Sequence, residues 1–545
     1  MLNSLLCNDG SKPKRKTFKL EQFARNEDGA FTIFVLFMVV LMLAITGMAM
    51  DVMKYERDRA SLQSTLDRAV LAAADLDQDL PAKAVVDSYM DKAGLGNLNA
   101  ITTVVEGFGS KKVSATAEAV VPTRYLRFGK VTELGLVATS AAEESIGAVE
   151  ISLILDISGS MSRSSATPSK TKIAVLREAA SEFVRLMLDK PNETQISISI
   201  VPYATQVNAG ASILDKFTNV TQEHSYSHCV NFIPEQYSDS DLERDDTLER
   251  TAHFDPFTYS EGSIDLPVCP VRAGSAITPV TDNMNKLLAQ IASLTPGGNT
   301  SIDIGMKWGT ALLDPSMRGI VRDLSLEQDP SHAGTTIVPS KFSVRPSDYG
   351  TDVLKIAIVM TDGQNTDQYM LNPSLREGMS DVWYNPEADE YTVYHSQGRP
   401  NFFWPQQDVW ADHPYGNPEP ETQLNEEPGT AVRLSYPELF NRVSLAWNAR
   451  YNYYWQSSGW AEWYSKAYAK VETSAKNQRT KHICDAAKDQ GIIVYGIAFE
   501  APRSGYRTLK DCASSDSHVY DVSGLNLEKA FESIASSIRK LRLTQ

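Results

Sequence analysis

The stretch Val149-Glu-Ile-Ser-Leu-Ile-Leu-Asp-Ile-Ser-Gly-Ser-Met-Ser162 decides the fold of the larger part of this chain. Its apolar run, residues 151–155, predicts a buried strand that ends at Asp156. Ser158 and Ser160 follow at alternate positions, so one carboxylate and two hydroxyls project from a single loop after the strand. Ligands bind at that end of the strands in an open α/β sheet. Oxygen ligands at this spacing suit a hard cation such as Mg²⁺.

The pattern Asp156-x-Ser158-x-Ser160 resembles the metal-ion-dependent adhesion site (MIDAS) of von Willebrand factor A domains. Two later segments follow in the order that this family has. The first, Pro296-Gly-Gly-Asn-Thr300, is similar to the family's second loop, and the second is an apolar strand, 354–360, that leads to an acid. The resemblance implies a divalent metal, Mg²⁺ first with Mn²⁺ or Ca²⁺ as alternatives, held by Asp156, Ser158, Ser160, Thr300 and Asp362.

The resemblance also implies how such a site acts. In the family, the hydroxyls that match Ser158, Ser160 and Thr300 touch the metal, and the carboxylates act mainly through waters. Neutral hydroxyls leave the charge of the ion poorly compensated, so an open position favours an Asp or Glu carboxylate of a protein partner. The alternative from the residues alone is that Asp156 and Asp362 only cap the helices that follow them.

Enzyme motifs do not support catalysis. Ser169-x-x-Lys172 matches the first element of penicillin-binding enzymes, but the sequence lacks their Lys-Thr-Gly and Ser-Asp-Asn elements. It also lacks a Gly-x-Ser-x-Gly elbow, a phosphate loop and a Gly-x-Gly-x-x-Gly turn after a strand. We therefore expect a binding protein and no enzyme.

Length, charge and hydropathy define the remaining organisation. The 545 residues are enough for two or more folded units, and the net charge of −16 argues against nucleic-acid binding, which needs a basic face.

Residues 30–50 carry no charge and are long enough to cross a bilayer, so we expect a tail at 1–29 and a transmembrane helix at 30–51. A cleaved signal peptide is the alternative. The tail is predicted to be cytoplasmic because it contains six basic residues: Lys12, Lys14, Arg15, Lys16, Lys19 and Arg25.

After the membrane segment, residues 52–147 predict a small α+β unit. Apolar residues recur at intervals of three and four up to Ala74, which extends the helix and gives it one apolar face. That face packs either on another helix or on the next segment of the same chain. A helix at 81–93 and three strands follow, at 101–108, 112–121 and 136–141.

This N-terminal part resembles the TadE/TadG-like proteins of tight-adherence (Flp/Tad) pilus assembly. The resemblance is carried by Glu27-Asp-Gly-Ala-Phe-Thr-Ile-Phe34, Asp51-x-x-Lys-Tyr-Glu-Arg57 and Leu66-Asp-Arg-Ala-Val-Leu-Ala-Ala-Ala74. Joined to a C-terminal A domain, it indicates the TadG type. It implies a single-pass protein of the bacterial inner membrane with its bulk in the periplasm, and partners among pilus or pilus-assembly subunits.

Residues 148–541 predict the A domain itself, an α/β fold with a doubly wound, mostly parallel sheet, because strands alternate with helices. Two insertions are expected, near 207–275 and 364–465. Strands are predicted at 150–155, 196–201, 354–360 and 492–499. Helices are predicted at 171–189, 280–293, 302–313, 465–490, 505–513 and 525–541.

Aromatic residues crowd the second insertion. It contains seven of the eight tryptophans, at positions 383, 404, 410, 447, 455, 460 and 463. They form either a small core of the insertion or a surface that stacks on sugars or a protein. The second possibility gives the alternative function, a surface adhesin or glycan-binding protein that uses the same metal site and the aromatic insertion.

The chain contains five cysteines. Cys7 lies in the predicted tail and is expected to be a free thiol. The other four can pair in three ways, and the sequence does not choose among them. Cysteines outside the membrane fit an oxidising compartment. The expected bonds each flank one element, Cys229–Cys269 and Cys484–Cys512.

Overall fold

The computed structural model describes residues 28–75, 78, 80–98, 100–107, 110–145, 148–188, 195–259, 262–350, 353–417 and 427–544. Most of the predicted tail, residues 1–27 with Cys7, lies outside these ranges. The chain divides into two compact units, Met1–Ser145 and Ile146–Gln545.

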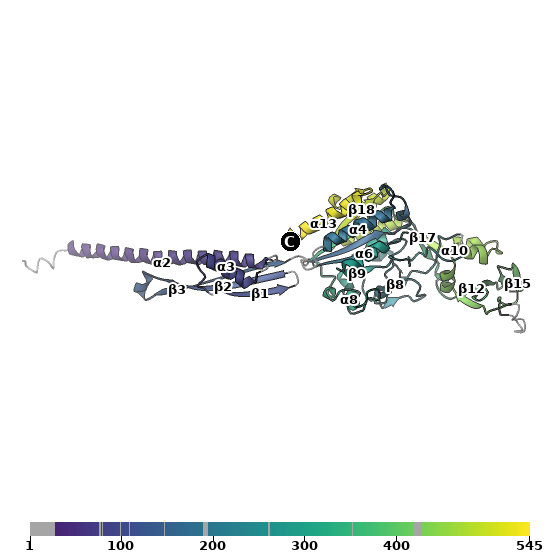
Figure 1. The fold of residues 1–545 in the computed structure, drawn as a ribbon, viewed down its shortest axis with the longest axis horizontal. Helices are drawn as coiled ribbons and strands as arrows, with labels where there is room; N and C mark the ends of the chain where they lie inside the picture. The colour runs from purple at the N-terminus through teal and green to yellow at the C-terminus, as the bar shows by residue number, and fades with distance from the viewer. Residues whose placement is uncertain are drawn as a thin grey trace, which may run out of the picture. The chain divides into compact units, whose positions relative to one another are not determined.

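The first unit is one long helix packed on a three-stranded antiparallel sheet (Figure 1). The helix, α2 (Asp28–Ala74), is continuous, as the sequence predicted. Within the described residues it is the one helix long and apolar enough to cross a membrane. The other elements are α3 (Ala82–Lys92), β1 (Ala100–Gly107), β2 (Ser110–Pro122), the 3-10 helix η1 (Leu126–Gly129) and β3 (Glu133–Ser145).

The second half of α2 buries its apolar face within the same unit. Its side of the core consists of Leu62, Leu66, Ala69, Val70, Ala73 and Ala74. Alternate residues of β2 meet them, and Val113, Ala115 and Ala117 are fully or almost fully buried. Alanine on both surfaces lets the helix lie close to the sheet. The apolar face is therefore covered by the same chain, which was one of the two alternatives.

The second unit is built on a six-stranded sheet in the order β19-β18-β10-β4-β5-β9. Five strands are parallel, and β9 pairs with β5 in the antiparallel sense. The central strand β4 is the apolar run that opens the domain, and it is buried along nearly its whole length. The strands are β4 (Ala148–Asp156), β5 (Ile196–Tyr203), β9 (Thr278–Thr281), β10 (Val353–Thr361), β18 (Ile493–Phe499) and β19 (Val519–Val522).

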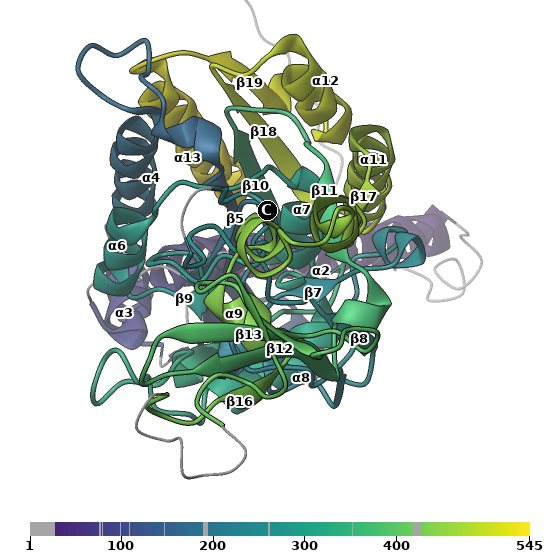
Figure 2. The same cartoon turned by 90° about the vertical axis from the view of Figure 1, so that its right-hand side faces the viewer.

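Helices cover both faces of this sheet, in two separate cores (Figure 2). Ile151, Leu153 and Leu155 of β4 belong to the core beneath α4 (Lys172–Leu188), α6 (Met284–Ser293) and α13 (Asn526–Thr544). Ile154 faces the other core, beneath α7 (Ile302–Ala311), α11 (Thr473–Asp489) and α12 (Arg503–Cys512). The predicted α/β class with helices between strands is thereby confirmed.

Two predicted helices are shorter than expected. The helix expected from 280 begins at Met284, because residues 278–281 form the edge strand β9 and Asn283 caps the helix by accepting a hydrogen bond from Lys286 N at 3.1 Å. The helix expected from 465 begins at Thr473, because β17 (Tyr468–Val471) pairs with β11 (Gln368–Leu371). In both cases tertiary pairing replaces the local helical tendency.

The two insertions contain short elements and a core that they share. Phe254 and Val268 of the first insertion pack with Leu439, Phe440 and Tyr453 of the second. The first insertion contains α5 (Ala211–Leu214), β6 (Asn219–Val220), β7 (Val230–Asn231), η3 (Pro234–Tyr237) and β8 (Thr247–Arg250). The second contains a sheet of five strands, β12 (Met379–Asn385), β13 (Glu390–Tyr394), β14 (Phe402–Trp404), β15 (Val409–Ala411) and β16 (Val432–Ser435). It also contains the 3-10 helix η6 (Pro373–Leu375), the α-helices α9 (Tyr436–Arg442) and α10 (Leu445–Trp447) and the π-helices η8 (Asn448–Asn452) and η9 (Ala461–Ser465).

The remaining elements lie near the sheet. They are the 3-10 helices η2 (Gly159–Ser162), η4 (Pro315–Met317), η5 (Ser340–Phe342) and η10 (Asp516–His518), and the helix α8 (Arg318–Leu324). Both expected disulfides are present, Cys229–Cys269 and Cys484–Cys512. The second joins α11 to the end of α12, beside one sheet face.

Candidate metal site at the carboxyl edge of the sheet

Parallel pairing of two strands sets the position of the candidate site. β4 and β10 are neighbours in the sheet, with Leu155 opposite Met360. The next residue of β4 is Asp156, and Asp362 follows β10 directly after Thr361. Because both strands end at the same edge, the two carboxylates leave the sheet together. The order of the motifs in the sequence leads us to expect this proximity.

Asp156 is fully buried and held by two hydrogen bonds. Ser158 N donates to Asp156 Oδ1 at 2.7 Å, and Thr361 Oγ1 donates to Asp156 Oδ2 at 2.6 Å. Burial, and after it the neighbouring Asp362 carboxylate, raises the pKa of Asp156 to about 7. The fold therefore places a carboxylate where its negative charge is costly unless a cation compensates it.

A chain of side-chain hydrogen bonds joins the first loop to the third. Ser158 Oγ lies 3.0 Å from Ser160 Oγ, and Ser160 Oγ donates to Asp362 Oδ1 at 2.6 Å. Asp362 Oδ2 is buried and accepts no hydrogen bond beyond its ion pair with Lys172. Both acidic residues thus interact across loops, beyond any role as caps of a following helix.

The second loop joins the same cluster through its glycine. Gly159 N donates to Gly298 O at 2.9 Å, which fixes the loop of Thr300 against the loop of Ser160. Gly298 has a φ of +77°, and a side chain there would lie 2.7 Å from Thr205 Oγ1. A Cβ at Gly363 would lie 3.6 Å from Thr300 Oγ1 and 3.7 Å from Ser160 Oγ. All three predicted loops therefore meet at one place.

A lysine that the motif does not include also reaches this cluster. Lys172, the first residue of α4, places its Nζ 3.0 Å from Asp362 Oδ2. The same Nζ lies 3.9 Å from Glu500 Oε2 and donates to Glu500 O at 3.3 Å. Glu500 is itself fixed, because Oε1 accepts from Ser165 Oγ and from two backbone amides. In the sequence, Lys172 stands out only as part of an enzyme motif whose other elements are missing.

A second lysine, Lys476 of α11, is fully buried and fastens two loops together. Its Nζ donates to Thr300 O at 3.0 Å, to Ser301 Oγ at 2.5 Å and to Thr366 O at 2.8 Å. The nearby carboxylate of Asp303 lies 3.8 Å away. Burial lowers the pKa of Lys476 to about 8, against the opposing effect of Asp303. Because α11 is a mostly polar helix in sequence, no sequence signal distinguished this lysine.

The side chain of Asn365 supports the same region. Asn365 Oδ1 accepts a hydrogen bond from Ile302 N at 2.7 Å, and its Nδ2 donates to Asn477 Oδ1 and Thr480 Oγ1. It thus satisfies a free amide in the first turn of α7 and ties it to α11. Asn365 lies three residues after Asp362, so a search of the third loop for polar residues could have found it.

The donor set limits what the site can hold. Among the described residues, no three His, Cys, Asp or Glu side chains gather where they could bind a metal. A metal at this edge would therefore use the hydroxyls of Ser158, Ser160 and Thr300 together with two carboxylates. Such an all-oxygen set suits Mg²⁺, Mn²⁺ or Ca²⁺ better than zinc.

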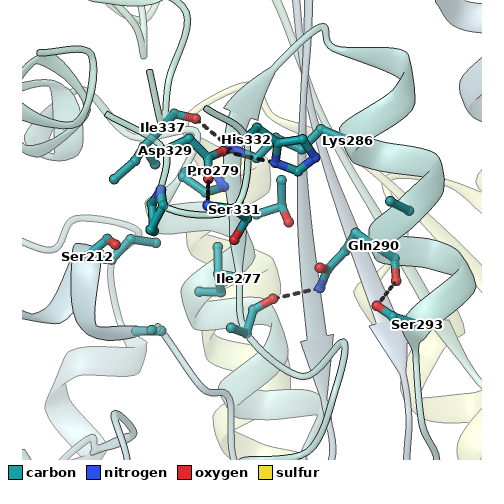
Figure 3. A pocket seen from close by; sticks show the side chains of 17 residues that line it. Ser212, Ile277, Pro279, Lys286, Gln290, Ser293, Asp329, Ser331, His332 and Ile337 are labelled. Carbon is teal, nitrogen blue, oxygen red and sulfur yellow. Dashed lines mark hydrogen bonds and ion pairs between the residues drawn. The ribbon is translucent and has the colours of Figure 1, made fainter. Parts of the chain in front are cut away.

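A separate hollow of about 350 Å³ opens beside β9 and α6 (Figure 3). Its polar groups bond mainly to one another: Lys286 Nζ lies 2.6 Å from Asp329 Oδ2, and Gln290 Nε2 donates to two backbone carbonyls. Its described lining residues include none of the five predicted ligands. The hollow is therefore distinct from the candidate metal site.

The aromatic residues of the second insertion pack mainly against one another. Tyr453 and Trp463 stack with ring centroids 4.2 Å apart, and Trp410 lies edge-on to Trp455 at 4.9 Å. Trp410 and Trp460 remain 37% exposed. The insertion thus has its own aromatic core, which was one of the two alternatives for these residues.

Residues 29–76 match the family described as "Putative Flp pilus-assembly TadE/G-like". The comparison with curated protein sequences gave no match. The match covers most of α2 and leaves the second unit outside it.

Solved structures similar to this chain include domains of pilus proteins. The von Willebrand factor domain of the type V pili tip protein Mfa5 from Porphyromonas gingivalis is 15% identical, with a TM-score of 0.31, and the alignment covers 73% of this chain and 96% of that one. The open conformation of the pilus adhesin SpaC from Lactobacillus rhamnosus GG is 11% identical, with a TM-score of 0.28. That alignment covers 81% of this chain but 34% of SpaC, so the chain spans about a third of that adhesin.

Proposed function

We propose that this chain, with its TadE/G-like N-terminal segment, is a membrane-anchored component of Flp/Tad pilus assembly. Its second unit binds an Asp or Glu of a protein partner through a divalent metal. The observation that carries the proposal is the hydrogen bond of 2.6 Å from Ser160 Oγ to Asp362 Oδ1, which joins loops 202 residues apart. That bond brings a hydroxyl loop and a carboxylate loop together at the sheet edge where ligands bind.

The residues fit a hard divalent cation. Asp156, Ser158, Ser160, Thr300 and Asp362 offer oxygen donors, and the buried Asp362 Oδ2 accepts no hydrogen bond beyond its ion pair with Lys172. When bound, the metal supplies a positive charge with a coordination position for an outside carboxylate. Mg²⁺ is the first candidate, with Mn²⁺ or Ca²⁺ as alternatives.

The chain's own residues prepare the site. Thr361 and Ser158 N orient Asp156, and Lys476 holds the loop of Thr300 in place. Lys172 compensates the charge of Asp362 when no metal is bound. A metal and Lys172 would therefore share one carboxylate, so metal binding must weaken this ion pair.

The anchor determines where this site works. The apolar part of α2 crosses the inner membrane once, with the basic amino-terminal side in the cytoplasm. The bulk of the chain then lies in the periplasm, which suits its two disulfides. There it can meet pilus or pilus-assembly subunits that offer an Asp or Glu.

A pull-down from cells with the full chain in detergent, with and without chelator, tests this function. We expect pilus or pilus-assembly subunits to bind in Mg²⁺, and to be lost with chelator or with Ser158→Ala. Ser164→Ala is the matched control, because Ser164 is an exposed serine of the same loop. Equal binding by all three proteins, with and without chelator, would refute the metal-mediated contact.

A second candidate, a surface adhesin or glycan-binding protein, is supported by the partial exposure of Trp410 and Trp460. Exposed tryptophan rings can stack on sugars. Binding to immobilised glycans that is lost in Trp410→Ala would favour it. Persistence of that binding in Ser158→Ala would assign it to the aromatic insertion and not to the metal site. Loss in neither variant would argue against a role of this surface.

A further inference from the structure

We propose that the turn between β2 and β3 docks on the lipid headgroups of the membrane that α2 crosses. The turn, residues 124–131, comprises η1 and its flanks, and here it is called the β2–β3 tip. The inference rests on the proposed anchoring of α2 and adds a second contact between the same unit and the bilayer.

The β2–β3 tip lies against the end of the apolar segment. Tyr125 packs so closely on Gly47 that a Cβ at that glycine would lie 2.5 Å from the Tyr125 ring. Gly47 precedes Asp51, the first charged residue after the apolar run, by one turn of helix, about 6 Å. If α2 spans the bilayer, Tyr125 therefore sits at the level where acyl chains give way to headgroups.

Asp51 fixes the tip at this level. Its carboxylate accepts hydrogen bonds from the amides of Arg124, Tyr125 and Leu126, the shortest at 2.7 Å. Lys54 Nζ adds a bond of 3.5 Å to Pro122 O. Three successive amides on one carboxylate leave the tip little freedom to move along α2. Its height above the membrane is therefore set by α2.

The side chains on the tip match a membrane interface. Phe128 is 90% exposed and Tyr125 41% exposed, although both are aromatic. Arg124, Arg127 and Lys130 lie within the same eight residues, which contain no acid. Tyr and Trp rings are enriched at the headgroup level of membranes, and Phe side chains of interfacial segments bury into the boundary between headgroups and acyl chains. Basic side chains there are attracted to the phosphates of anionic lipids. The exposed ring of Phe128 would bury its apolar surface among the lipids.

A fluorescent label tests the depth of the tip. The full chain with Cys7→Ser and Phe128→Cys is labelled with an environment-sensitive fluorophore and reconstituted in vesicles of phosphatidylglycerol and phosphatidylcholine. A lipid nitroxide near the headgroups serves as quencher. Val105→Cys is the matched control, since Val105 is 61% exposed on β1 and pairs with Lys112, far along β2 from the tip.

The proposal expects a blue-shifted, strongly quenched signal at position 128 and a water-like, weakly quenched signal at 105. Replacing Asp51 by Ala should reduce the quenching at 128 because the tip is released from α2. The blue shift should weaken in phosphatidylcholine alone.

Two results would overturn the proposal. One is a water-like signal at 128 in vesicles that float with the protein, since the anchor would then hold without the tip. The other is a blue shift that appears equally in detergent and rises with protein concentration. Such a shift would mean that a second copy of the chain covers the label at position 128. If the protein does not float with vesicles at all, the proposed anchor itself fails, and flotation separates that outcome from the first.

Discussion

Lys172 and Asp362 form an ion pair of 3.0 Å inside the cluster of predicted metal ligands. The lysine side chain is 12% exposed and that of Asp362 is fully buried. The pair therefore supplies within the protein the positive charge that a metal would otherwise bring. If a metal binds as proposed, the metal and Lys172 compete for one carboxylate, and this competition can be measured.

Replacing Lys172 by Met should strengthen metal binding. The substitution removes the competing charge and keeps most of the side-chain volume, so Asp362 becomes fully available. We expect the affinity for Mg²⁺ to rise several-fold in isothermal titration of the full chain in detergent. Lys170→Met is the control, because Lys170 pairs with Glu178 and not with the cluster. Weaker Mg²⁺ binding by the Lys172 variant would mean that this lysine positions Asp362 for the metal.

Lys476→Met should loosen the second loop of the site. Lys476 is the common donor to Thr300 O, Ser301 Oγ and Thr366 O, and its loss leaves Asp303 buried without its cation. Removing one partner of a buried charge pair costs about 3–5 kcal/mol of unfolding free energy. Denaturant unfolding should show this loss, and titration should show weaker metal binding. Lys481→Met, on the exposed side of the same helix, should change neither; equal effects of both would contradict the assigned role.

Gly309→Ala should destabilise the second unit, because α7 lies very close to β4. A Cβ at Gly309 would come within 2.3 Å of Ile154 Cδ1. Overpacking of this kind costs about 1–3 kcal/mol. The same change at Gly319 is the control, since its Cβ would meet its nearest neighbour at 3.8 Å and alanine favours the helix by about 1 kcal/mol. Thermal unfolding that ranks the two variants in the reverse order would refute this packing argument.

The histidines in the first insertion should each lower the stability of the folded chain in mild acid. Burial lowers the pKa of His253 from 6.5 to about 4, and burial also lowers the pKa values of His224 and His228. Between these pH values the histidines bind more protons in the unfolded chain than in the folded one, so their contribution to the free energy of unfolding decreases as pH drops from 6.5 towards 4. The raised pKa of Asp156 contributes with the opposite sign in the same window. Urea unfolding across this window measures the slope.

His253→Gln should make the variant lose less stability than the parent between pH 6.5 and 4, because it lacks a group whose protonation favours the unfolded chain. His482→Gln provides the control, since His482 is exposed on α11. An unchanged slope in the His253 variant would assign the acid sensitivity to other groups.

Several elements followed from local sequence. The strands that carry Asp156 and Asp362 are apolar runs, and α2 is a long apolar and amphipathic helix, so their own residues specify them. The prediction of secondary structure was wrong where pairing with a distant segment determines the local conformation. Residues 468–471 form a strand because they pair with residues 368–371, and the edge strands β9 and β19 are too short to show a clear pattern.

The sequence by itself determined the three loop motifs, the membrane-length helix and the alternation of strands with helices, because residue type and spacing encode them locally. Only the tertiary structure decided which cations lie among the predicted ligands. Lys172 and Lys476 look like ordinary surface lysines in the sequence. Their charges enter the site because α4 and α11 pack at the sheet edge, where distant carboxylates and carbonyls satisfy them. A charged side chain can be buried only where other groups pair with it, and for these two lysines those groups lie far away in the chain.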